Sequence, residues 1–158
     1  MIDSARIIEI IKTKQEAVML QKQLDQLLTS IYANKPFEEI AAEELTFEKK
    51  EKLFDLIRYY RIDIRDHSHL QTFLQELKTV IQQVPIVALS LAFYPKQELI
   101  AAISTWFLAH IKKPFLLDIT VNEALLGGTV VAFNGKYFDY SLKKILEDKY
   151  AKGEIRLQ

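Results

Sequence analysis

Apolar residues recur at helical spacing through the first third of the chain. These positions are Ile7, Ile8, Ile11, Leu20, Leu24, Leu27 and Ile31. The last four step by four, three and four residues, which places their side chains on one face of a helix. The pattern predicts a single long helix over residues 5–33, ended by Asn34-Lys35-Pro36.

Two further amphipathic helices are predicted before residue 84, after a short helix over 37–44. Thr46 is the expected N-cap of the first, with Glu48 in the first turn, where the helix dipole favours an anion. The segment Ser68-His69-Leu70-Gln71 has the composition of a capping box and is expected to begin the second. The second helix then carries one apolar face: Leu70, Phe73, Leu74, Leu77, Ile81 and Val84. We therefore expect an N-terminal α-helical bundle over residues 1–84.

The second half changes its period and predicts a small unit of strands and helices over residues 85–158. Short apolar, β-branched segments predict strands over 85–93, 115–121, 129–133 and 136–138. The last two are joined by Asn134-Gly135, which suits a type I′ hairpin because both turn positions require a positive φ.

Two helices complete this predicted unit. One begins at Tyr94-Pro95 and ends at Lys112-Lys113-Pro114, because proline is favoured at a first helical position. The other follows Asp139 as its cap and ends near Gly153. The predicted fold class is α+β: an N-terminal helical bundle followed by a small β-α-β-β-β-α unit.

Composition removes several classes of function. The 158 residues include no cysteine, which excludes disulfides, thiolate-ligated zinc and a cysteine nucleophile. Lys and Arg total 21 and Asp and Glu total 21, a balance that argues against a strongly basic nucleic-acid binder. No apolar run approaches the ~20 residues that span a bilayer, and the first residues resemble neither a signal nor a transit peptide.

One cluster contains the residue types of a metal site. Asp63, Asp66, His67 and His69 lie within seven residues of one another. Carboxylate and imidazole suit zinc or manganese, but the spacing matches no standard ligand pattern. We expect an exposed loop between helices here and no metal site, and ion binding by the four side chains stays an open alternative.

Two other segments invite a binding interpretation. Bases and aromatics interleave at Arg58-Tyr59-Tyr60-Arg61, as in single-strand nucleic-acid binders, although the helix stripe also requires Tyr60. Gly127-Gly128-Thr129 lacks the Gly-Lys-Ser/Thr sequence of a phosphate loop, so backbone geometry is the simpler role for these glycines. We expect no catalytic, cofactor-binding or metal-binding residues.

The most informative helix is the charge-free one. Residues 99–111 include no Asp, Glu, Lys or Arg and are too few to span a membrane. A helix that is apolar on all sides is either buried on two sides or covered by a partner. We take Trp106, Phe107 and Ile111 as candidates for a partner contact.

The C-terminal half resembles a known family in the order of its motifs. The run from Leu117 through Leu125-Leu126-Gly127-Gly128 to Asp139-Tyr140-Ser141-Leu142 resembles the C-terminal signature of the F-type ATP synthase delta subunit, called OSCP in mitochondria. That signature has an apolar strand, an acidic turn, Gly-Gly, a Val-rich hairpin, Asp-Gly-Ser and a terminal helix. Tyr140 stands where the family has the glycine of Asp-Gly-Ser. Gly127, Gly128, Asp139 and Ser141 are the matching signature residues.

This resemblance implies a non-catalytic peripheral-stalk (stator) subunit that uses no cofactor. The helical domain (1–84) would bind the ATP synthase α and β subunits, and the C-terminal domain (85–158) the C-terminal helix of the b subunit. The implied location is the cytoplasmic face of a bacterial cell membrane, reached only through the complex. Alternatives are a helical adaptor unrelated to ATP synthase and a nucleic-acid module that uses Arg58–Arg65.

Overall fold

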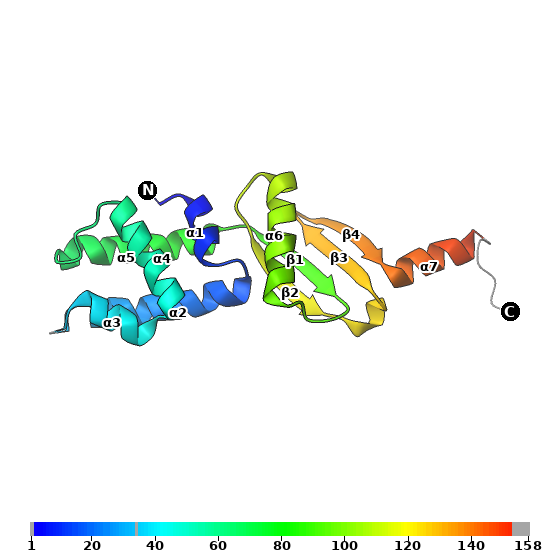
Figure 1. Ribbon diagram of the computed structural model, residues 1–158. Helices are drawn as coiled ribbons and strands as arrows, with labels where there is room; N and C mark the ends of the chain where they lie inside the picture. The colour runs from blue at the N-terminus through cyan, green and yellow to red at the C-terminus, as the bar shows by residue number, and fades with distance from the viewer. Residues whose placement is uncertain (1, 34, 153–158) are drawn as a thin grey trace. The chain divides into compact units, whose positions relative to one another are not determined.

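The chain divides into two compact units, Met1–Pro85 and Ile86–Gln158. The computed structural model describes residues 2–33 and 35–152 (Figure 1). It combines α-helices with one four-stranded mixed sheet, so the expected mixture of helix and strand is confirmed. In the described residues, no helix is both long enough and apolar enough to cross a bilayer.

The first unit consists of helices packed along their apolar faces. Their bounds are α1 (Ser4–Ile10), α2 (Lys14–Ser30), α3 (Phe37–Glu44), α4 (Phe47–Tyr59) and α5 (His67–Gln83). α2 packs against α5 and α3, and α1 packs against α4 and α5. The stripe predicted for α5, from Leu70 to Val84, is buried, as are Leu20, Leu24 and Leu27 of α2. Burial of these apolar stripes is the main stabilising contribution to this unit.

The prediction of one helix over residues 5–33 is wrong, because the chain breaks between α1 and α2. Ile11 is extended (φ −133°, ψ 143°), so the helical hydrogen bonding stops there. Thr13 then begins α2 with a capping box: its hydroxyl accepts from the Glu16 amide at 3.2 Å, and the Glu16 carboxylate accepts from the Thr13 amide at 3.1 Å. The apolar period continues across the break, which hides it in the hydrophobic pattern.

The starts of two other helices differ in detail from expectation. Thr46 occupies the N-cap position of α4 as predicted, but its side chain makes no capping hydrogen bond. The N-cap of α5 is Asp66, whose carboxylate accepts from the amides of Ser68 and His69. Ser68 therefore lies inside the first turn, and the capping box predicted at Ser68 and Gln71 is wrong.

The second unit is built on a four-stranded sheet. Its elements are β1 (Ile86–Leu91), α6 (Gln97–Ile111), β2 (Leu116–Val121), a 3-10 turn η1 (Glu123–Leu125), β3 (Gly128–Phe133), β4 (Lys136–Ser141) and α7 (Leu142–Ala151). The strand order is β2-β1-β3-β4. β1 and β2 are parallel and are joined through α6, whereas β3 pairs antiparallel with both β1 and β4.

Register and turn geometry fix the β3–β4 hairpin. Phe133 pairs with Lys136, and Asn134 and Gly135 between them have φ of 49° and 73°. Both φ values are positive, so the prediction of a type I′ geometry at Asn134-Gly135 is confirmed. β4 continues to Ser141, three residues beyond the predicted strand.

Helix ends in this unit are also corrected. α6 begins at Gln97 after Lys96, so Pro95 precedes the helix instead of occupying its first position. The N-cap of α7 is Ser141 rather than Asp139. The predicted end of α7 at Gly153 lies outside the described residues.

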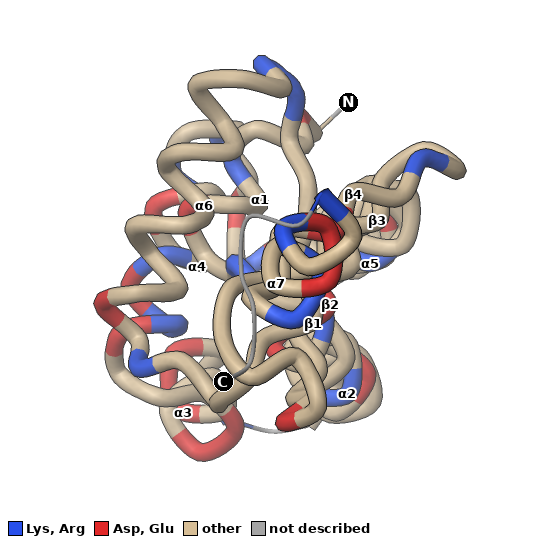
Figure 2. The backbone as a smooth tube through the Cα atoms, turned by 90° about the vertical axis from the view of Figure 1, so that its right-hand side faces the viewer, with Lys and Arg blue, Asp and Glu red and all other residues tan. Residues whose placement is uncertain are grey.

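α6 packs on one face of the sheet (Figure 1). Val87, Leu89 and Leu91 alternate along β1 toward α6 and are buried with Ile100, Phe115, Leu117 and Val131. Figure 2 shows little charge along α6, in contrast to the mixed charges of α4 and α7. Only Ile100 and Ser104 of α6 are buried, so much of this uncharged helix faces away from the core.

Candidate functional site

An apolar groove lies beside α6 on the face of the sheet that this helix covers. Its volume is about 580 Å³, within the range of small-molecule and cofactor pockets. Leu89, Leu91, Thr129 and Val131 of β1 and β3 line its floor. α6 forms one wall and β4 the other, and the lining is almost entirely apolar and aromatic.

The three candidate residues of α6 all line this groove, but they differ in burial. Trp106 is 57% exposed, whereas Phe107 and Ile111 are half-buried and pack against the core. Phe107 meets Phe115 edge to face with ring centroids 5.9 Å apart. Phe107 and Ile111 therefore hold α6 on the sheet, and Trp106 is the most exposed of the three side chains.

His110 fixes the orientation of the Trp106 side chain. The two rings stack with centroids 4.1 Å apart. The His110 Nδ1 lies 2.7 Å from the Trp106 carbonyl oxygen. Because a carbonyl only accepts, Nδ1 carries the proton and donates, one helical turn along α6. The indole is thus ordered before any partner arrives, which lowers the entropic cost of binding.

The second wall of the groove consists of two aromatic residues of β4. Phe138 and Tyr140 alternate along β4 and stack with centroids 6.4 Å apart and an interplanar angle of 4°. Their cross-strand partners are Val131 and Thr129, which lie on the groove floor. Both rings are exposed. The prediction missed this wall because it ended the strand at residue 138, although aromatic residues at period two were a signal for it.

The signature glycines lie at the junction of β3, β4 and α7. Gly127 has φ of 153°, and its carbonyl accepts from the Leu142 amide at 2.9 Å, so it caps the first turn of α7. Gly128 has φ of 75°, and a Cβ there would collide with the Tyr140 carbonyl oxygen and lie 3.1 Å from the Ser141 Cα. Both positions require glycine for geometric reasons.

The two polar signature residues are next to this junction. The Ser141 hydroxyl accepts from the Lys144 amide at 3.1 Å as the N-cap of α7. The Asp139 carboxylate accepts from the Ser141 amide at 2.9 Å. Hydrogen bonds from the Ser141 hydroxyl and amide, in that order, lower the pKa of Asp139. The structure thus brings Gly127, Gly128, Asp139 and Ser141 together as a scaffold for the β4–α7 connection.

α7 presents an apolar stripe that stays exposed in the part of the chain that the structure describes. Leu142, Ile145, Leu146 and Tyr150 are all exposed, and none of the residues of α7 is buried. The helix contacts β4 and η1. In a folded domain such a stripe is normally packed, so it is a second candidate surface of this unit.

The helical unit has a cleft between its N-terminal segment and α5. It measures about 380 Å³ and is lined by residues that include Ile2, Tyr60, Thr72 and Phe73. The Asp3 amide donates to the Tyr60 hydroxyl at 2.8 Å, and the Ile2 amide donates to the Glu76 carboxylate at 2.9 Å. These bonds hold the N-terminal segment against the cleft, where the buried side chains of Ile2 and Phe73 lie at its floor.

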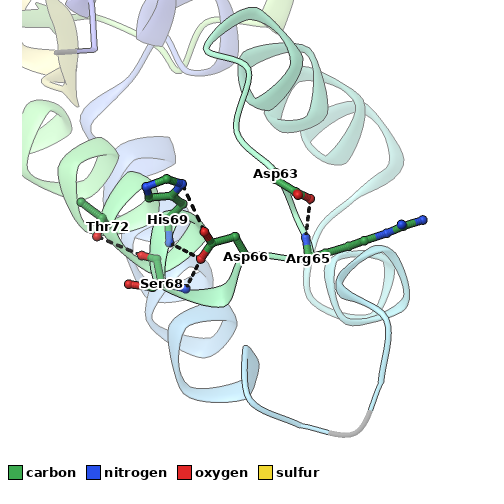
Figure 3. A network of polar contacts seen from close by, with 6 residues as sticks. All are labelled: Asp63, Arg65, Asp66, Ser68, His69 and Thr72. Atoms are coloured by element: carbon green, nitrogen blue, oxygen red, sulfur yellow. Dashed lines mark hydrogen bonds and ion pairs between the residues drawn. The ribbon is translucent and has the colours of Figure 1, made fainter.

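The Asp63–His69 segment forms a capping network (Figure 3). Asp63 accepts from the Arg65 amide at 2.9 Å, and Asp66 caps α5 while its second oxygen lies 3.3 Å from His69 Nδ1. His67 instead meets the Tyr32 ring edge to face. Within the described residues, no group of three or more His, Asp or Glu side chains is placed to hold a metal ion.

The Arg58–Arg61 segment makes contacts within the unit. Arg58 pairs with Asp55, and Tyr60 packs on Phe73 with centroids 6.0 Å apart. Tyr59 meets Tyr60 edge to face. The Arg6 guanidinium lies over the Tyr59 ring, with its Cζ 4.5 Å from the ring centroid. Arg58, Tyr59 and Tyr60 of this segment therefore make contacts inside the helical unit.

Comparison with known proteins points to one family. The family model described as the ATP synthase delta (OSCP) subunit matches residues 7–150, which is nearly the whole chain. No curated protein matches the sequence. Among solved structures, a chain of the Toxoplasma gondii mitochondrial ATP synthase hexamer is 13% identical, covering 98% of this chain and 96% of that chain with a TM-score of 0.41. A TM-score of 0.41 does not establish a shared fold, so the family assignment rests on the sequence match over residues 7–150.

Proposed function

The chain belongs to the ATP synthase delta (OSCP) subunit family, and from this membership we propose how its two units act. It is a peripheral-stalk subunit of ATP synthase, a structural component associated with the membrane through the complex. Membership disfavours the alternative of a helical adaptor unrelated to ATP synthase. The proposed location is the cytoplasmic face of a bacterial cell membrane.

The proposed division follows the two units. The N-terminal helical bundle binds the α and β subunits of the catalytic head, and the C-terminal β-α-β-β-β-α unit binds the C-terminal helix of the b subunit. Together they hold the head against the rotor, so that torque drives ATP synthesis instead of turning the head. Neither unit needs an active site for this mechanical role.

The groove beside α6 is the observation that carries the proposal for the stalk contact. It combines an ordered, exposed indole at Trp106 with the aromatic wall of Phe138 and Tyr140. An amphipathic helix binds such a groove by inserting apolar side chains at positions i, i+3, i+4 and i+7. Exposed aromatic anchors of this kind contribute most of the binding free energy at interfaces.

For the head contact, we propose the cleft between the N-terminal segment and α5. The N-terminal segment of an α subunit would pack against Ile2 and Phe73 at its floor and pass Thr72 at its rim. The aromatic and apolar floor supplies the affinity, and the polar rim supplies orientation.

Binding to a peptide of the b subunit tests the stalk contact. The synthetic peptide has the sequence of the last helix of b, and we expect Trp106→Ala to weaken its binding by about tenfold or more. The matched control is Tyr94→Ala, since Tyr94 is 59% exposed in the same unit but does not line the groove. Equal affinity of the wild type and the Trp106 variant would place the stalk contact elsewhere.

Two arginine substitutions on α5, one inside the cleft and one outside it, test the head contact. Thr72 and Thr79 are both exposed on α5, and each hydroxyl donates to the carbonyl four residues earlier, at 2.9 and 3.0 Å. Only Thr72 lines the cleft. Thr72→Arg should reduce co-purification with α3β3 and Thr79→Arg should not; the same yield for both variants contradicts this contact.

A further inference from the structure

Three lysines are neighbours, in sequence or in strand pairing, of the lining residues Ile111 and Phe133 at one end of the groove beside α6. Lys112 and Lys113 follow Ile111 at the end of α6, where Lys112 is the left-handed C-cap with φ of 54°. Lys136 opens β4 and pairs with Phe133 across the hairpin. Because side chains alternate along a strand, Lys136 shares the groove face with Phe138 and Tyr140.

The sheet register places these lysines at the same end of the unit. β1 and β2 start side by side at Ile86 and Leu116, just after the turn that holds Lys112 and Lys113. β3 runs antiparallel to β1, so its last residue, Phe133, and the hairpin lie at that same end. The groove therefore has a cationic end formed by its two opposite walls.

Contacts inside the chain do not explain these charges. Within residues 2–33 and 35–152, none of the three lysines takes part in an ion pair. The α6 dipole favours a cation at Lys112 and Lys113, but Lys136 is in a strand and gains nothing from it. The other end of the groove, at the start of α6, carries Lys96 beside Glu98, which balance each other.

We propose that a stalk helix binds in this groove in a single orientation, with an acidic end of that helix beside Lys112, Lys113 and Lys136. This inference rests on the proposed function, in which the occupant is the end of a stalk helix. The apolar floor supplies the affinity in either direction, and the lysines distinguish the two directions. Electrostatic complementarity of this kind mainly adds specificity and speeds association.

Two peptides with the same apolar face test the direction. Each has about 18 residues, enough for five helical turns, with acetylated and amidated ends and leucines at i, i+3, i+4 and i+7 spacing. One carries three glutamates at one end, and the other carries glutamines there. Trp106 is the chain's single tryptophan, so its emission reports occupation of the groove in the full-length protein.

We expect the glutamate peptide to bind about fivefold to tenfold more tightly than the glutamine peptide at low salt, since three exposed ion pairs form. The difference should vanish at about 300 mM salt. It should also vanish in the Lys112→Gln/Lys113→Gln/Lys136→Gln variant, with the glutamine peptide bound equally by both proteins. A nitroxide on the glutamate end should broaden the amide signals of Lys136 and Tyr137 more than those of Thr129.

The outcomes separate the two levels of the proposal. If both peptides shift Trp106 emission with equal affinity, or the nitroxide broadens Thr129 more, the direction is overturned and the stalk site stands. If neither of these peptides nor the peptide of the b subunit changes Trp106 emission, the groove is not the stalk site, and both proposals fall. An unchanged melting temperature of the triple variant shows that the lysines act on binding and not on folding.

Discussion

Gly128 packs directly against the backbone of Tyr140, with no room for a Cβ between them. In the register of β3 with β4, Thr129 opposes Tyr140 and Gly128 opposes Ser141. The close approach lets β4 pass into α7 while Gly127 caps the helix through its carbonyl. The same backbone segment also presents the Tyr140 ring to the groove.

Replacing Gly128 by alanine should strongly destabilise the second unit. The new Cβ would overlap the Tyr140 carbonyl oxygen, and φ of 75° is unfavourable for any other residue. We expect a loss of about 3 kcal/mol or more in the free energy of unfolding. Urea unfolding followed by Trp106 emission measures it for this unit.

Gly135→Ala is the matched control, because Gly135 has a nearly equal φ of 73° but nothing within 4 Å of its Cβ position. It should cost only the backbone strain, about 1 to 2 kcal/mol. Similar decreases in the free energy of unfolding for both variants would show that the contact with Tyr140 does not affect stability.

Asp139 should make stability depend on pH at the acidic end. Its pKa in the folded state lies below the usual 3.8, because the charged carboxylate accepts hydrogen bonds from Ser141. The stabilisation is therefore complete above about pH 4 and disappears as pH falls through the lowered folded pKa. At pH 7 the urea midpoint of unfolding should be higher for the wild type than for Asp139→Asn. The two midpoints should converge as the pH is lowered. A gap that widens on acidification would contradict this assignment.

The capping box at Thr13 should stabilise the start of α2. Thr13→Ala removes the acceptor of the Glu16 amide, and we expect a cost of about 1 kcal/mol. Hydrogen exchange should show faster exchange at the first amides of α2, with α3 unchanged. Thr29→Ala is the control, since the Thr29 hydroxyl donates to Asp25 within the same helix and caps nothing.

Two apolar residues of α6 should separate folding from binding. Ile100 is 1% exposed in the core, so Ile100→Ala should lower stability by about 3 kcal/mol. Trp106→Ala should cost less than about 1 kcal/mol, since the indole is largely solvated. Calorimetry compares the two, and a large loss for the Trp106 variant would mean that the indole serves the fold instead of a partner.

Local signals in the sequence predicted much of this fold. The Asn134-Gly135 hairpin and the α5 stripe follow from turn chemistry and helical periodicity alone. The break before α2 was missed because apolar spacing continued across it, although Thr13 and Glu16 stand at capping-box spacing. At α7 the N-cap is Ser141 instead of Asp139, because β4 extends through Asp139 to Ser141 and α7 begins only after it. The prediction ended this strand at residue 138.

The candidate site depended on contacts that no local pattern contains. Trp106 is a candidate because it lies in an uncharged helix, but Phe138 and Tyr140 come from a strand about thirty residues later. Only the register of β3 with β1 and β4 places those rings opposite α6. The cationic end likewise joins Lys112 and Lys136 through sheet order, which long-range pairing determines.

α7 ends the described chain without a single buried side chain. Within the described residues, its contacts include the Ser141 cap, the Gly127 carbonyl, an ion pair between Lys144 and Asp148 at 2.9 Å, and packing on β4 and η1. A helix of ten residues with so little packing is marginal in water. Its amides should therefore exchange with deuterium long before those of α6, and a partner that covers the apolar stripe should slow that exchange selectively. Deuterium uptake by this helix would then report the assembly state of the stalk.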